Sequence, residues 1–197
     1  MSKVGFTHPN FVKQNLGGFT LIETLITITI LVLVLGVIYG VYLLSQKTYQ
    51  EGERLSEITQ NSRVILERIT REVRQAKEIV TELPEEEISA TSTLMFEDGH
   101  IPEPYHYIHY FQEDNFVQRE VIGFYFSDDA GETLVPWDAE PPVGQNLLTK
   151  TLAEVQIIGE YITDLKFFGS QVIQINLDLA KKNTNLKLSS KVFGRNF

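Results

Sequence analysis

An uncharged run from Thr24 to Leu44 constrains the fold of this chain more than any other feature. A helix rises about 1.5 Å per residue, so a run of about 20 residues spans the roughly 30 Å hydrocarbon core of a bilayer. We therefore expect one membrane-spanning helix. Lys3 and Lys13 precede it, and the bias of basic residues toward the cytoplasmic side predicts a cytoplasmic N-terminus with the rest of the chain outside.

Residues 1–18 have the character of a leader peptide. The segment contains two bases and no acid, and it ends in Gly17-Gly18. In a secretory signal the small residues follow the apolar region, whereas here they precede it. A cut at the glycine pair would therefore leave the membrane helix in the mature chain.

Length and charge exclude several classes of protein. The 197 residues suffice for one ordinary domain with an extension. Beyond Gly18 the chain has 15 bases and 26 acids, a surface that repels phosphate backbones. There are no cysteines, so neither a disulfide framework nor a thiolate zinc site is available.

Beyond Ser45 the pattern becomes amphipathic and remains helical. Apolar or small residues recur at steps of three and four: Leu55, Ile58, Ser62, Ile65, Ile69, Val73, Ala76 and Val80. Charges four residues apart predict four ion pairs: Arg63–Glu67, Glu67–Arg71, Arg68–Glu72 and Arg74–Glu78. Leu83-Pro84 ends the pattern. We expect one continuous helix from about Phe19 to Glu82.

The rest of the chain has the texture of β-strands. Segments such as "VIGFYF", "QVIQINLDL" and "LKLSSKVF" are separated by Gly, Pro, Asn and Asp clusters, and residues 181–185 read as a hairpin turn. The prediction is an α+β chain in which the helix packs on an antiparallel sheet, with a long loop at 127–145. Its expected segments are a leader (1–18), a membrane helix (19–44), a stem (45–83) and a sheet head (84–197).

The stretch "GGFTLIE", Gly17 to Glu23, followed at once by the apolar run, resembles the class III signal of type IV pilins and type II secretion pseudopilins. Three further segments resemble minor subunits of these systems, called J in secretion pseudopili and W in type IV pili: "NSRVILERITREVRQA", "ITDLKFFG" and "VFGRN". The resemblance implies a pilin-like fold, a structural role, and partners in the form of other pilin-like subunits, a prepilin peptidase and an inner-membrane assembly platform.

The same resemblance implies a processing site. In that family the peptidase cuts after the glycine and methylates the new amino terminus, which corresponds here to cleavage between Gly18 and Phe19 and methylation of Phe19. Gly17 occupies a position where Lys or Arg is common, which implies slower cleavage than in close relatives.

Glu23 is the one acid at the start of the apolar run. A carboxylate near the hydrocarbon boundary requires a partner or a route to water, because an unpaired charge there is costly. The resemblance implies that it neutralises the amino terminus of a neighbouring subunit's Phe19; the alternative is an acid that lies among lipid headgroups. Gly36 and Gly40 form a small-xxx-small pair that favours close helix packing.

We expect no cofactor and no catalytic activity, because the sequence contains no nucleophile elbow, Walker loop or zinc helix motif. His106 and His109 would point to opposite faces of a strand, which argues against a metal site. Some pseudopilins hold calcium, so the acids weighed for that ion are Asp128, Asp129, Glu132, Glu97 and Asp98. None has the spacing of a dedicated calcium loop, and solvated turn acids are favoured.

Three functions remain open at this stage. The first is a pilin or pseudopilin subunit that initiates or joins a filament, and Glu23 argues against the tip subunit, which lacks that acid in this family. The second is a membrane-anchored extracellular binding module. The third is a DNA-uptake pseudopilin, for which a basic cluster near the C-terminus argues and the 18 acids against eight bases in 83–197 argue against. The cluster is Lys181, Lys182, Lys187, Lys191 and Arg195.

Overall fold

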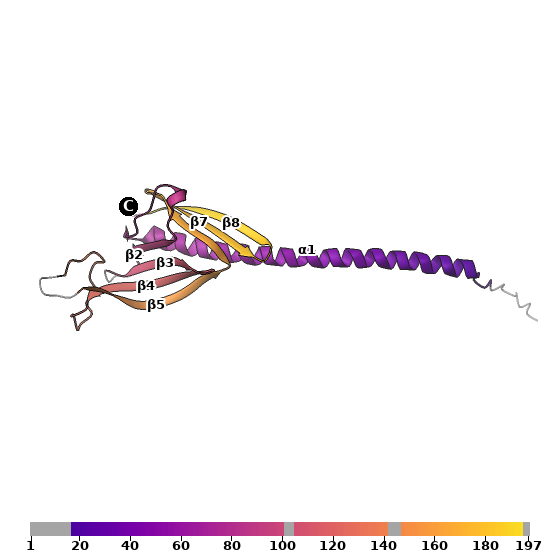
Figure 1. Cartoon of the computed structure of the whole chain (residues 1–197), viewed down its shortest axis with the longest axis horizontal. Coiled ribbons are helices and arrows are strands. Elements are labelled where there is room, and N and C mark those ends of the chain that lie inside the picture. Colours follow the sequence, from indigo (N-terminus) through magenta and orange to yellow (C-terminus); the bar gives the residue numbers. More distant parts are fainter. Residues whose placement is uncertain (1–16, 101–104, 142–146, 195–197) are drawn as a thin grey trace, which may run out of the picture. The chain divides into compact units, whose positions relative to one another are not determined.

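The structure is a computed structural model, and it describes residues 17–100, 105–141 and 147–194. Most of the predicted leader, with Lys3 and Lys13, and the last residue of the basic cluster, Arg195, lie outside the described residues. The chain divides into two compact units, Met1–Thr48 and Tyr49–Phe197. The helix α1, Leu21–Gln75, supplies residues to both (Figure 1).

The described part of the first unit is the start of α1. Its large apolar side chains from Leu21 to Leu44 are all exposed. Its length and composition suffice to cross a membrane. The predicted apolar helix is therefore present, and a helix surface as apolar as this one is suited to contact with lipid or with another apolar helix.

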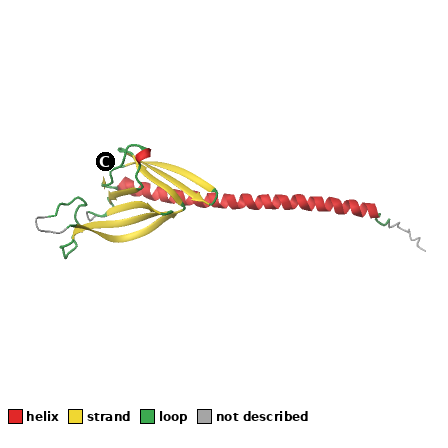
Figure 2. Cartoon of the chain, viewed as in Figure 1, coloured by secondary structure: helices red, strands yellow, loops and turns green. Residues whose placement is uncertain are grey.

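The second unit consists of two antiparallel sheets and the last part of α1 (Figure 2). The five-stranded sheet has the order β1-β2-β3-β4-β5, and the three-stranded sheet has the order β6-β7-β8. The strands of the first sheet are β1 Glu78–Ile79, β2 Thr93–Glu97, β3 Tyr107–Glu113, β4 Phe116–Phe126 and β5 Leu148–Glu160. Those of the second are β6 Ile162–Phe168, β7 Val172–Lys181 and β8 Thr184–Phe193. The α+β class is confirmed, with two sheets in place of the one expected.

One apolar stripe of α1 forms the core with both sheets. Ile58, Ser62, Ile65, Ile69 and Val73 are fully buried, at the three- and four-residue steps that the sequence predicts. Ile65, Ile69 and Val73 belong to one core cluster with buried residues of β2, β3, β4, β6, β7 and β8. Leu55, which the pattern also placed on this stripe, is exposed. The stripe therefore begins one turn later than expected.

The helix ends at Gln75, seven residues before the predicted end at Glu82. Its backbone turns into the five-stranded sheet, where the amide of Lys77 donates to the carbonyl of Glu97 and β1 pairs with β2. Three consecutive β-branched residues, Ile79 to Thr81, favour this extended course. Gly99 packs against the helix end so closely that a Cβ there would lie 1.9 Å from the carbonyl oxygen of Gln75.

Only one of the four predicted ion pairs on the helix forms. Arg68 Nε lies 3.4 Å from Glu72 Oε1, and Glu78 is in β1 instead of the helix. Within the described residues, Arg63, Glu67, Arg71 and Arg74 make no ion pair; the long side chains extend into solvent, where such pairs contribute little. The predicted hairpin at 181–185 is present, with Lys181 opposite Thr184 across the turn between β7 and β8.

Candidate functional site

The segment before α1 is open on all sides within its unit. Gly17 to Thr20 precede the helix in exposed, non-helical conformation, and Phe19 keeps 76% of its surface exposed. A Cβ built on Gly18 would meet no atom within 4 Å. The Gly18–Phe19 bond therefore lies in an exposed stretch that is not folded into the helix.

Thr20 caps the helix. Its carbonyl accepts from the amides of Glu23 and Thr24 at 3.1 and 3.2 Å, and its hydroxyl lies 3.4 Å from the amide of Glu23. Thr20 and Glu23 thus have the spacing of a capping box, in which a Ser or Thr is followed three residues later by Glu. The four letters "TLIE" contain this motif, so the cap is readable from the sequence, although it is not among the features predicted above.

Glu23 lies in the first turn of α1. Its negative charge is favourable there because the first-turn amides carry partial positive charge. Its carboxylate is exposed and has no basic partner among the described residues. The helix start therefore explains why an acid is tolerated, and the carboxylate remains available to a cation from another chain.

Three threonines interrupt the apolar surface of α1 without leaving free hydroxyls. Thr24, Thr27 and Thr29 each donate to a carbonyl three or four residues earlier, at 2.6 to 3.0 Å. Such back-bonding satisfies the hydroxyl inside the helix, which a helix in hydrocarbon requires.

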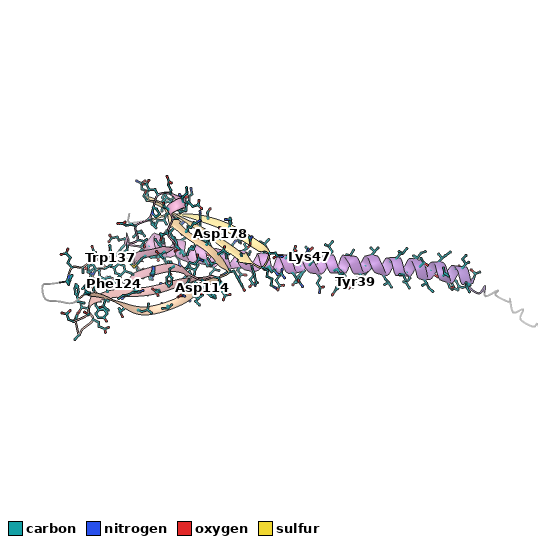
Figure 3. The ribbon with its side chains drawn as sticks, viewed as in Figure 1. Tyr39, Lys47, Asp114, Phe124, Trp137 and Asp178 are labelled. Atoms are coloured by element: carbon teal, nitrogen blue, oxygen red, sulfur yellow. The ribbon has the colours of Figure 1, made fainter. Side chains whose placement is uncertain are left out.

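The far end of the apolar stretch carries residues typical of a membrane interface. Tyr39 and Lys47 project from the helix surface (Figure 3), and Tyr42 is also exposed. Lys47 is the first charged residue after Glu23. From Glu23 to Lys47 the helix rises about 36 Å at about 1.5 Å per residue, which exceeds the hydrocarbon thickness of about 30 Å. The two charges thus bracket a segment of membrane length, and the tyrosines suit the headgroup level.

Gly36 and Gly40 are one helical turn apart on the same face of α1. A Cβ built at either position would meet no atom within 4 Å in the described chain. The two glycines therefore leave a shallow notch on which another helix can pack closely.

Two histidines of the second unit make contacts within that unit. His109 on β3 lies 3.3 Å from Glu120 and stacks on Phe111, and burial lowers the pKa of its imidazole. His106 lies just before β3, and its carbonyl accepts from the amide of Asp98. In the described parts of the chain no three His, Asp or Glu side chains are grouped to hold a metal.

The acids weighed for calcium form turns and ion pairs. Asp129 accepts from the amides of Gly131 and Thr133, which lower the pKa of its carboxyl. Glu97 pairs with Lys77 at 2.8 Å, and Asp98 accepts from the amide of His100.

A buried network fixes the last turns of α1 to the five-stranded sheet. Glu72 accepts from the hydroxyl of Tyr110 at 2.6 Å and from Nε of Arg119 at 2.9 Å. Burial and the charge of Glu72 raise the pKa of Tyr110. Burial lowers the pKa of Arg119, but its hydrogen bond and charge pairing with Glu72 outweigh this and raise it. Sequence reasoning assigned Glu72 only to the pair with Arg68, because its other partners are 38 and 47 residues away.

Comparison with known proteins agrees with the N-terminal features and extends no further. A family model described as the prokaryotic N-terminal methylation motif matches residues 14–39. No curated protein and no solved structure gives a significant match. The matched segment includes Gly18, Phe19, Glu23 and Gly36.

The chain thus carries a class III signal of the pilin and pseudopilin type. This signal supports the assignment of the chain as a substrate of a prepilin peptidase. Together with the apolar helix, the signal is consistent with membrane anchoring and with a role as a structural subunit. The match covers a small part of the chain, and the second unit takes its description from the structure alone.

Proposed function

We propose that this chain is a minor subunit of a type IV pilus or a type II secretion pseudopilus, similar to the subunits called W and J. The observation that carries the proposal is the coincidence, at residues 14–39, of a methylation motif, an exposed Gly18–Phe19 bond and the start of an apolar helix. A tethered protein needs only the last of these.

In this proposal the peptidase cuts between Gly18 and Phe19 and methylates the amine of Phe19. The subunit then waits in the cytoplasmic membrane with its N-terminus inside and the second unit outside, as the basic leader favours. An assembly platform in that membrane moves it into the filament, where it joins or initiates the subunit stack. We propose no cofactor and no catalytic activity for it.

Glu23 and the glycine pair make the filament contacts in this scheme. The exposed carboxylate of Glu23 pairs with the amine of a neighbouring subunit's Phe19, and loss of water around the pair strengthens the attraction. The notch at Gly36 and Gly40 allows neighbouring helices to approach closely.

The DNA-uptake alternative is weakened by how the C-terminal lysines are used. Lys187 pairs with Asp178, and Lys181 pairs with Glu57 and lies 4.4 Å from the centre of the Tyr161 ring. Two cations of the predicted basic cluster are therefore already neutralised within the chain.

The substitution Glu23→Gln separates the subunit from the tethered module. We expect normal cleavage and methylation, because the scissile bond is intact, and at least a tenfold loss from filaments, equivalent to about 1.4 kcal/mol. The measurement is the amount of the chain in filaments sheared from cells, together with the intact mass of the membrane pool.

The matched control is Glu53→Gln, an exposed acid on the same helix beyond the apolar stretch, which should enter filaments like the wild type. Equal recovery of the Glu23 and Glu53 variants in filaments would contradict the proposed role of Glu23 and favour a helix that acts only as an anchor.

A further inference from the structure

A groove in the second unit gathers unpaired arginines. It lies between the last turns of α1 and β8, has a volume of about 730 Å³, and is lined by Arg63, Arg71 and Arg74 with Leu66 and Leu188. None of the three arginines has an acidic partner among the described residues, and all three are exposed. Glu67 also lines it, so the groove, which we call the arginine groove, keeps a net positive charge in a chain rich in acids.

A turn in the same unit presents the opposite charge and an apolar side chain. Glu85 and Glu86 are exposed and unpaired in the described chain, and Ile88 keeps 96% of its surface exposed. Two hydrogen bonds hold the turn against the three-stranded sheet. The carboxylate of Glu87 accepts from Asn176 at 2.8 Å, and the carbonyl of Pro84 accepts from the amide of Gly169. We call residues 85–88 the glutamate turn.

We propose that the arginine groove of one copy of this chain receives the glutamate turn of a second copy. Glu85 and Glu86 would face Arg71 and Arg74, and Ile88 would lie against the apolar floor of the groove. The phosphates of a nucleic acid would pair with the arginines, but they would leave the apolar floor of the groove without an apolar partner. The acidic remainder of the chain also repels a nucleic acid.

Within one copy, the turn is held against the three-stranded sheet. The short helix η1, Glu87–Ser89, contacts β6, and Glu87 lines a hollow with Asn176 of β7 and with Leu188 and Ser189 of β8. Among the described residues, no ion pair joins Glu85 or Glu86 to the arginines of the groove within one copy. A contact between these two different surfaces of two copies is heterologous, so it either closes into a ring or repeats from copy to copy.

The contact is small, so it depends on concentration. Exposed ion pairs are weak individually, and one isoleucine buries little area compared with a stable interface. Confinement of two copies to one membrane or one filament raises their effective concentration. In this respect the inference rests on the proposed function, which supplies that confinement.

The absence of cysteine permits a direct test by crosslinking. One copy carries Thr70→Cys in the groove, and the other carries Ser89→Cys beside the turn. The full-length chains carry different epitope tags, are produced together, and are treated in native membranes with a short bismaleimide. Gln156→Cys, exposed on β5 of the other sheet, replaces Thr70→Cys as the control.

We expect a mixed dimer with Thr70→Cys and at least tenfold less with the control. Arg71→Glu with Arg74→Glu in the groove copy should reduce the dimer at least tenfold, as should Glu85→Arg with Glu86→Arg in the turn copy. When both reversed pairs are present, the charges again match across the contact and the dimer should return. The proposal would be overturned if none of the four charge reversals changed the amount of mixed dimer, or if that amount did not exceed the amount in the control.

A second readout distinguishes this proposal from the proposed function. The intact mass of each variant reports cleavage after Gly18, which the charge reversals should not change. Normal cleavage without the mixed dimer overturns only the contact. A DNA duplex retarded by the chain through Arg71 and Arg74, with no mixed dimer, would assign the groove to nucleic acid and also overturn the contact.

Discussion

Replacement of Glu72 by Leu is expected to lower the free energy of unfolding of the second unit by about 2 to 4 kcal/mol, because it leaves a buried cation without its partner. Arg119 keeps only 10% of its side-chain surface exposed, and Glu72 is its closest acid at 2.9 Å. Glu154, the other acid near it, is 3.6 Å away and more than half exposed. The hydroxyl of Tyr110 would lose its acceptor as well.

The measurement is denaturant unfolding of the full chain in detergent, followed through the fluorescence of Trp137, the one tryptophan. Trp137 is not part of the Glu72 network. Its backbone amide donates a hydrogen bond to the hydroxyl of Tyr107 on β3, so its fluorescence reports on the same sheet. Glu67→Leu, an exposed and unpaired acid on the same helix, is the control and should change stability by less than about 0.5 kcal/mol.

A double variant tests the physical reason. With Arg119→Met present, Glu72→Leu should cost less than it does alone, since no buried charge remains to be orphaned. Equal costs in the two backgrounds would show that the pair does not couple the helix to the sheet.

Gly169→Ala is the second substitution with a large expected effect, and two separate causes add. Gly169 has a φ of 104°, which residues with a Cβ rarely adopt, and a Cβ there would lie 2.1 Å from the carbonyl oxygen of Val172. We expect a loss of about 2 to 4 kcal/mol, since strain and overpacking of a backbone each cost about 1 to 3 kcal/mol.

The same fluorescence measurement applies, with Gly52→Ala as the control. Gly52 is helical with open space around its Cβ position, so alanine should stabilise the chain slightly. A Gly169→Ala chain as stable as the wild type would show that the turn between β6 and β7 relaxes without cost.

The parts of the fold that the sequence predicts are those that depend on neighbours in the chain. The apolar run, the stripe from Ile58 to Val73 and the hairpin at Lys182 each follow from local periodicity or turn chemistry. The early end of α1 depends on a pairing with Glu97, 20 residues beyond Lys77, which no local pattern contains. The β-branched residues from Ile79 to Thr81 are the local sequence feature that favours an extended chain here and therefore an earlier end of the helix.

The candidate site divides in the same way. Gly18, Phe19 and Glu23 form a contiguous motif, so a sequence can reveal them, as can the overlooked cap at Thr20. The Glu72 network and the arginine groove require strands that are distant in sequence to come beside α1. Charge spacing on the helix alone predicted pairs such as Arg63 with Glu67, whereas the sheet contacts decide which charges are paired.

The most direct test of the central claim is the intact mass and N-terminal sequence of the chain from its native membranes, for the wild type and for Gly18→Ala. We expect a wild-type chain that starts at methylated Phe19 and a Gly18→Ala chain that keeps its leader. A wild-type chain that still starts at Met1 or Ser2 would contradict it.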